Sequence, residues 1–178
     1  MSRLSSLSSA AIRAMFASET DEQLITLITI YDPDDQTTPV LRLCDGYVGE
    51  LTGLTTDEEK VYGVHRNSDS VNFVFLPLQI QLPSEAETGA ESCSLSLNYV
   101  TTEAIELIRT QLTKPAKILI ELILSGTPNV TEATFSGFYI TDATYSQEQI
   151  RLSLSMISYS REPFPSFNFV PSYFPGLF

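Results

Sequence analysis

Ser92–Tyr99, which reads SCSLSLNY, is the most regular stretch of this 178-residue chain. Its residues alternate between polar and apolar, which places on one face Cys93, Leu95, Leu97 and Tyr99. Successive side chains of a β-strand point to opposite faces of the sheet, so this period of two predicts a strand with one buried face. A strand of this kind needs partners, and the neighbouring segments supply them.

The segments with the strongest β propensity predict two or more further strand pairs. Leu24–Tyr31 (LITLITIY) is rich in β-branched residues and is followed by the turn Asp32–Asp35 and the strand Val40–Cys44. Ile118–Leu124 is almost continuously apolar, broken only by Glu121, and predicts a strand covered on both faces. The chain is therefore expected to be mainly β.

The remaining strand segments are less regular. Val71–Leu82 alternates, but Pro77 interrupts it and predicts a bulge or an edge position because proline has no N–H for the ladder. Thr134–Tyr145 and Gln149–Tyr159 predict a final hairpin around residues 146–148. The segments 45–60 and 83–91 are acidic, contain glycine and are expected to be loops.

Two segments have helical spacing and add an α component. Leu4–Ala17 places apolar residues on one face, and Ser8 or Ser9 can cap a shorter version of this helix. Residues 102–113 contain a second helix, Glu103–Leu112, which Thr101 or Thr102 can cap and Pro115 stops. Both helices are expected to flank the β domain.

A length of 178 residues fits one domain. We assign that β domain to residues 20–159, with a helical segment 1–19 before it and an arm 160–178 after it. No apolar run approaches the roughly 20 residues of a membrane helix. The predicted core follows from the apolar faces of the central segments and comprises Leu95, Leu97, Ile105, Ile108, Ile118, Ile120, Leu122, Leu152 and Leu154.

The composition changes abruptly at Ser160. Proline recurs every few residues, which forbids a helix or a central strand, yet the segment is too aromatic for a solvated linker. We expect an extended arm that buries its aromatic rings on a neighbouring subunit, or alternatively folds back on its own domain. The candidate interface residues are Pro163, Phe164, Pro165, Phe167, Phe169, Pro171, Tyr173, Phe174, Pro175 and Phe178.

The net charge of −12 argues against a nucleic-acid-binding protein. The chain has 22 acidic and 10 basic residues and no basic stripe, and an acidic surface repels phosphate backbones. The same charge fits an ordinary solvated surface or, alternatively, a channel wall that DNA passes without sticking. Candidate acidic groups for such a wall lie at Asp57, Glu58 and Glu59 or at Glu85, Glu87 and Glu91.

No motif of enzyme or metal chemistry is present in the sequence. His65 is the only histidine, and no serine lies in a nucleophile-elbow motif that would make it the partner of His65 in a catalytic triad. The positions of His65, Cys44 and Cys93 do not match the spacing of zinc ligands. Cys93 is expected to be a buried thiol, with a Cys44–Cys93 disulfide left possible. Asp32–Asp35 resembles the start of a calcium loop but lacks its glycine and later glutamate, so turn chemistry is expected. We therefore expect a non-enzymatic protein without cofactor or metal.

The order of segments resembles a family of uncharacterised tail-tip, baseplate or minor tail proteins of long-tailed bacteriophages and prophages with a lambda-type tail tip. The similarity covers Thr20–Phe178 and rests on the unit TTEAIELIR (101–109), which leads into the strand 116–124, and on REPFP (161–165). Its most specific part is the ending PSYFPGLF (171–178).

This resemblance implies a tail-tube-like β-barrel or sandwich with flanking helices, and no catalytic or metal-binding residue. It implies a homo-oligomeric structural subunit whose ring joins the tail tube to the distal tip of the virion, assembled in the bacterial host cytoplasm. Expected partners are other tail-tip, tail-tube and tape-measure proteins, with DNA passing only transiently and no membrane insertion. One barrel per chain favours six-fold over three-fold symmetry. The alternative is a monomeric β-sandwich that binds a receptor or carbohydrate, with Tyr47, Tyr62 and Tyr173 as platform aromatics.

Overall fold

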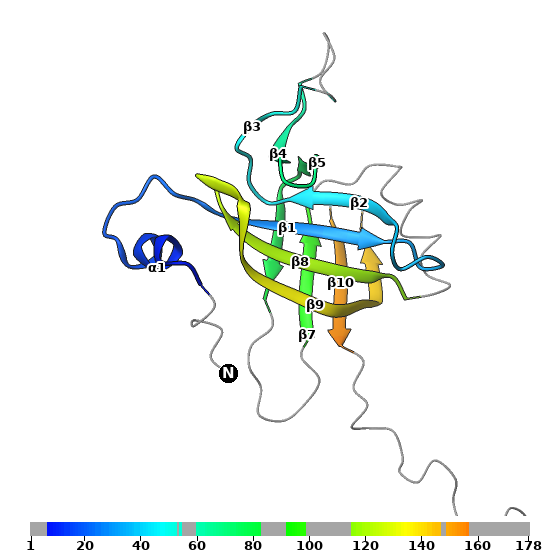
Figure 1. The fold of residues 1–178 in the computed structure, drawn as a ribbon. Coiled ribbons are helices and arrows are strands. Elements are labelled where there is room, and N and C mark those ends of the chain that lie inside the picture. The colour runs from blue at the N-terminus through cyan, green and yellow to red at the C-terminus, as the bar shows by residue number, and fades with distance from the viewer. Residues whose placement is uncertain are drawn as a thin grey trace, which may run out of the picture.

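The computed structural model describes residues 7–52, 54, 60–82, 92–98, 115–146 and 149–156. Within these ranges the chain is mainly β, as expected, with one helix and ten strands (Figure 1). In chain order the elements are α1 (Ser9–Phe16), β1 (Leu24–Tyr31), β2 (Pro39–Cys44), β3 (Gly49–Glu50), β4 (Tyr62–Arg66), β5 (Val71–Phe75), β6 (Leu78–Gln81), β7 (Ser92–Leu97), β8 (Lys117–Leu124), β9 (Thr127–Tyr145) and β10 (Ile150–Met156).

All ten described strands belong to one sheet, in the order β3-β4-β5-β2-β1-β8-β9-β10-β7-β6. Neighbours are antiparallel except β2 and β5, which pair in parallel. The sheet is therefore large, mixed and unclosed in the described part of the chain, with β3 and β6 at its two edges. The predicted helix 103–112 and the predicted arm lie outside the described residues.

The long strand β9 carries the sheet from one layer to the other. Its first part pairs with β8 and its last part with β10, with register shifts in both ladders. Such bulges bend a strand and increase its twist. As a result β7 and β10 run across β1, β2 and β8 (Figure 1). The sheet folds over on itself and encloses its main core.

That main core contains side chains from strands far apart in the sheet order. Ile28 of β1, Ile120 of β8, Leu95 of β7 and Leu152 of β10 are all fully buried in one cluster with Phe138 of β9. Seven of the nine predicted core residues are confirmed as buried: Leu95, Leu97, Ile118, Ile120, Leu122, Leu152 and Leu154. The other two, Ile105 and Ile108, lie outside the described residues.

A second, smaller cluster covers the opposite face of the central strands. Ile25 and Leu27 of β1 pack there with Val64 of β4, Phe73 of β5 and Ile123 of β8. Strands β1 and β8 thus contribute side chains to both clusters. The expected cover on both faces of segment 118–124 is confirmed at Ile123, whereas Leu119 and Glu121 on the second face are only half-buried.

The run Val71–Leu82 does not form one strand. It divides into β5, beside β2, and β6, at the far edge of the sheet beside β7. The break falls at Leu76 and Pro77, where proline cannot donate to a ladder. The edge position expected for this run is confirmed for β6, and the two halves of the run bury their apolar side chains in different clusters. Phe73 packs in the second cluster and Ile80 against the main core.

Other strand limits also differ from the sequence-based prediction. Strand β9 begins at Thr127 rather than at residue 134, the predicted loop 45–60 contains the short strand β3, and β4 was not predicted. These additions carry few large apolar residues in an alternating pattern. Their strand conformation depends on partner strands, which local patterning cannot reveal.

Helix α1 begins after Ser8, as the shorter of the two expected versions. The Ser8 hydroxyl accepts a hydrogen bond from the Ala11 N–H (3.1 Å) and donates one to the Glu132 carboxylate (2.7 Å). The Ser8 N–H donates to the other oxygen of the same carboxylate, also at 2.7 Å. Glu132 lies on β9 and is buried, so this pair anchors an eight-residue helix that would be marginal in isolation.

We expect Ser8→Ala to destabilise α1 by about 1–2 kcal/mol, because it removes the cap and one partner of a buried carboxylate. Hydrogen exchange of the Ala11 and Ile12 amides measures this directly. Ser9→Ala is the matched control, since Ser9 is exposed and should change stability by less than about 0.5 kcal/mol. Equal protection in both variants would contradict the anchoring role of Ser8.

Candidate functional site

The residues proposed from the sequence as a subunit interface, Pro163 to Phe178, lie outside the described residues. So do the acidic side chains proposed for a channel wall, at positions 57–59, 85, 87 and 91. These assignments remain predictions from the sequence.

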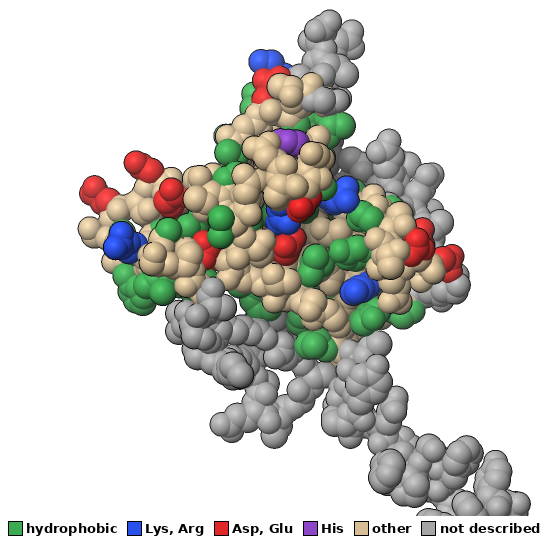
Figure 2. Space-filling model, viewed as in Figure 1, with side chains coloured by type: hydrophobic (Ala, Val, Ile, Leu, Met, Phe, Trp, Pro, Cys, Tyr) green, Lys and Arg blue, Asp and Glu red, His purple; other side chains and the backbone are tan. Residues whose placement is uncertain are grey.

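His65 is a surface residue on strand β4. Its side chain is exposed, visible in purple in Figure 2, and its Nδ1 lies 2.6 Å from the Asn72 amide oxygen on the paired strand β5. No group of three or more metal-binding side chains occurs within the described ranges. In the Asp32–Asp35 turn, the Asp32 carboxylate accepts from the Asp34 N–H at 2.8 Å, which is the expected turn chemistry.

The two cysteines are free thiols buried in different clusters, Cys44 in the second and Cys93 in the main core. The possible disulfide is therefore not formed, and Cys93 is the buried thiol expected from the sequence. Burial raises the pKa of Cys44 to about 12 and that of Cys93 to about 11. Both thiols stay protonated at neutral pH and are poor nucleophiles.

Thiol labelling at pH 8 should therefore be at least tenfold slower in the native protein than in the same protein in denaturant. The raised pKa values also give a pH dependence. Below about pH 9 both thiols are protonated in the folded and in the unfolded protein, so they do not change the free energy of unfolding. Above about pH 9 the thiols ionise first in the unfolded protein, and the free energy of unfolding falls. Denaturant titrations at pH 8 and pH 10 measure this, and Cys44→Ala should reduce the loss. Equal native and denatured labelling rates would contradict the burial.

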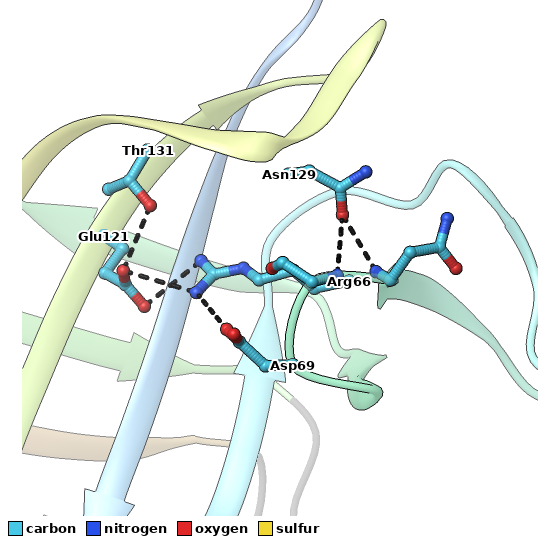
Figure 3. A network of polar contacts seen from close by, with 7 residues as sticks. Arg66, Asp69, Glu121, Asn129 and Thr131 are labelled. Carbon is cyan, nitrogen blue, oxygen red and sulfur yellow. Dashed lines mark hydrogen bonds and ion pairs between the residues drawn. The ribbon is translucent and has the colours of Figure 1, made fainter.

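The most distinctive polar feature of the described residues is an ion-pair network on the face of the second cluster (Figure 3). Arg66, at the end of β4, reaches across to Glu121 of β8, with Nη2 3.2 Å from Oε2. Arg66 also pairs with Asp69 at 3.4 Å, and the Thr131 hydroxyl of β9 donates to Glu121 at 3.2 Å. The Arg66 guanidinium lies 5.6 Å from the centre of the Phe73 ring.

A neighbouring residue extends this attachment. The Asn129 side-chain oxygen accepts from the N–H groups of Asn67 and Ser68 at 2.8 and 3.3 Å. Asn67 and Ser68 form the turn between β4 and β5, whereas Asn129 lies on β9 (Figure 3). The network therefore attaches the β4–β5 hairpin to the central strands. Backbone pairing joins the hairpin to these strands only through the β2–β5 ladder.

Beside this network lies an open groove of about 390 Å³. Its floor is the outer face of β1, β2 and β8, where Thr29 stands opposite Arg42 and Leu119 in the two ladders. The β4–β5 hairpin forms its wall through Arg66, Asp69, Val71 and Phe73. Basic, acidic and apolar side chains meet on the face drawn in Figure 2.

The sequence alone did not identify Arg66, Glu121 or Arg42 as members of a site. One signal was present, because Glu121 interrupts the otherwise apolar segment 118–124. A charged residue in a strand buried on both faces needs a partner, and Arg66 is that partner. The identity of the partner depends on how β4 folds over β8, which the local pattern does not contain.

A second feature is an aromatic patch near the β3 edge. The rings of Tyr47 and Tyr62 are 5.5 Å apart, and Tyr47 also contacts Phe75 edge-on at 5.3 Å. Tyr47 is 54% exposed and Tyr62 42% exposed. Two of the three platform aromatics considered from the sequence are thus brought together, while Tyr173 lies outside the described residues.

Among the described residues, no helix is long and apolar enough to cross a membrane. Comparison with known proteins finds no family model and no curated protein that matches this chain.

Proposed function

We propose that this chain is a structural subunit of a bacteriophage tail tip or baseplate, which forms a ring between the tail tube and the distal tip. In this proposal the folded-over sheet is a tail-tube-like barrel or sandwich. The observation that carries it is a mainly β sheet that buries its own core between residues 25 and 154 and is followed by a proline- and aromatic-rich segment.

The unclosed sheet supports assembly with other chains. In the described residues β3 and β6 have a neighbour on one side only, and edge strands expose N–H and C=O groups that another chain can pair with. Strand β6, Leu78–Gln81, carries the exposed side chains of Gln79 and Gln81 and no charge. Nothing in its sequence opposes pairing in the way that edge lysines do.

The C-terminal segment supplies the proposed fastening. Each buried aromatic side chain removes about 150–250 Å² from water, worth several kcal/mol at about 25 cal/mol per Å². The prolines reduce the entropy lost when the segment docks. About eighteen extended residues reach roughly 50–60 Å, which is enough to lie on a neighbouring subunit.

The remaining parts of the proposal follow from charge and copy number. A net charge of −12 suits a lumen that DNA crosses without binding, with the acidic residues 57–59 or 85, 87 and 91 facing it. One barrel per chain favours a six-fold ring that matches a tail tube, with tube, tip and tape-measure proteins as neighbours. The protein would act without catalysis or cofactor and reside in the virion.

A chain ending at Tyr159 tests the proposal. We expect electron microscopy and native mass measurement to show rings of the full-length protein and a folded monomer of the truncated chain. A control of unchanged length replaces the arm's aromatic residues by serine and should behave like the truncation. An unfolded product would indicate that the arm packs on its own domain. A full-length chain that stays monomeric at high concentration would contradict the proposal.

One observation favours a second candidate, a β-sandwich module that binds a receptor or carbohydrate. The adjacent exposed rings of Tyr47 and Tyr62 offer a surface on which a sugar ring can stack. Under this candidate the full-length chain is a monomer that binds a glycan, and Tyr62→Ser abolishes binding. Tyr31→Ser, outside the patch, is the control. Glycan-array binding unaffected by Tyr62→Ser would reject the platform.

A further inference from the structure

We propose that the groove beside the Arg66 network binds a side-chain carboxylate of a partner polypeptide, with Arg42 as the principal counter-ion. The proposal concerns binding at one site and does not depend on ring formation. It rests on the unpaired guanidinium of Arg42, on the ion pairs that Arg66 forms with Asp69 and Glu121, and on the apolar lining.

Arg42 faces the groove and has no charged partner in the described part of the chain. Its neighbours Leu41 and Leu43 point to the main core, so the alternation of β2 places Arg42 on the opposite face, across from Thr29. Its side chain is half-buried and lines the groove, yet it forms no ion pair there. A partly desolvated guanidinium without a counter-ion is a ready anion-binding group.

The other charged groups around the groove already have partners, which leaves the Arg42 guanidinium as the group that can attract an anion. Asp69 and Glu121 are both paired with Arg66, and Lys117 lies beside the groove with its ammonium 5.6 Å from the centre of the Tyr31 ring. Arg42, Arg66 and Lys117 therefore stand against three carboxylates, because Asp35 of the nearby turn also lies beside the groove, where it accepts hydrogen bonds from the hydroxyls of Thr37 and Thr38. The charges around the groove are thus balanced, whereas the whole chain has a net charge of −12.

Arg66 adds an unsatisfied donor to the same surface. Only 8% of this residue is exposed, and its Nε has no hydrogen-bond partner. Its Nη2 lies close to Glu121 but without hydrogen-bond geometry. Buried donors are rarely left unpaired, so Glu121 and Asp69 satisfy the Arg66 guanidinium only in part.

The lining favours a polypeptide over a sugar. A glycan usually needs several free polar groups, but Asp69, Glu121 and Arg66 are committed to one another. What remains is one free guanidinium, the hydroxyls of Thr29 and Tyr31, and apolar walls from Val71, Phe73, Leu119 and Pro39. This set fits a carboxylate on a short aliphatic stem, as in a glutamate side chain, with apolar neighbours from the same peptide.

The test is an NMR titration of the full-length, isotope-labelled chain with a glutamate peptide, acetyl-Gly-Glu-Gly-amide. We expect saturable shifts of the Thr29 and Arg42 amides with a Kd on the order of 1 mM, since one ion pair supplies most of the binding. The same peptide with glutamine should bind about tenfold or more weakly, because it lacks the charge. Glucuronate is titrated in parallel to represent an acidic glycan.

Arg42→Gln keeps the length and polarity of the side chain and should weaken glutamate-peptide binding about tenfold or more. Arg42→Lys should restore part of it by returning the charge. Arg151→Gln, which removes an exposed arginine on β10, is the matched control and should bind like the unaltered chain. Thermal unfolding confirms that each variant is folded. Equal binding in all variants, no saturation, or tighter binding of glucuronate would overturn the proposal.

Discussion

Phe138→Ala should lower the free energy of unfolding by about 3–5 kcal/mol. Phe138 is 1% exposed and lies in the part of β9 where the strand passes from β8 to β10. Its ring occupies the main core between the two layers, so truncation leaves a cavity that strands from both layers line. Chemical denaturation monitored by circular dichroism measures the loss.

Phe16→Ala is the matched control, because the same side chain is removed from a position that is 79% exposed. We expect a change of less than about 0.5 kcal/mol there. Leu97→Ala, on β7, should cost about 2–5 kcal/mol and tests the strand from which the fold class was deduced. Unchanged stability of Phe138→Ala and Leu97→Ala would mean that the two layers do not enclose a common core.

Glu121→Ala should cost about 3–5 kcal/mol, because it leaves the buried charge of Arg66 with only the more exposed Asp69 as partner. The Glu121 and Arg66 side chains are 13% and 10% exposed, so solvent screens their interaction poorly. Loss of this attachment should also release the β4–β5 hairpin. Hydrogen exchange of the Val64 and Phe73 amides, together with denaturant unfolding, reports both effects.

Two further variants distinguish the loss of the Arg66–Glu121 ion pair from a general effect of removing a carboxylate. Glu50→Ala breaks the Glu50–Lys60 contact of 3.9 Å between well-exposed side chains and should cost less than about 1 kcal/mol. The double variant Arg66→Met with Glu121→Leu should recover most of the stability, since no unpaired charge remains buried. If Glu121→Ala were as mild as Glu50→Ala, the network would not hold the hairpin.

The class of the fold and most strand positions follow from local patterns in the sequence. Alternation in Ser92–Leu97 and the apolar segments 24–31 and 118–124 are local signals, because the two-residue period of a strand decides which side chains can be buried together. The same locality explains the Ser8 cap, whose hydroxyl reaches an N–H three residues ahead.

Which strands lie next to one another, in contrast, depends on the packing of the whole domain. Strands β5 and β6 are separated by two residues yet lie at distant positions in the sheet, and β2 pairs in parallel with β5. Arg66 and Glu121 are 55 positions apart and meet because the β4–β5 hairpin folds over β8. Strand order and such contacts depend on the packing of whole layers, where many distant side chains must be buried at once. Local periodicity in the sequence therefore does not predict strand order or long-range contacts.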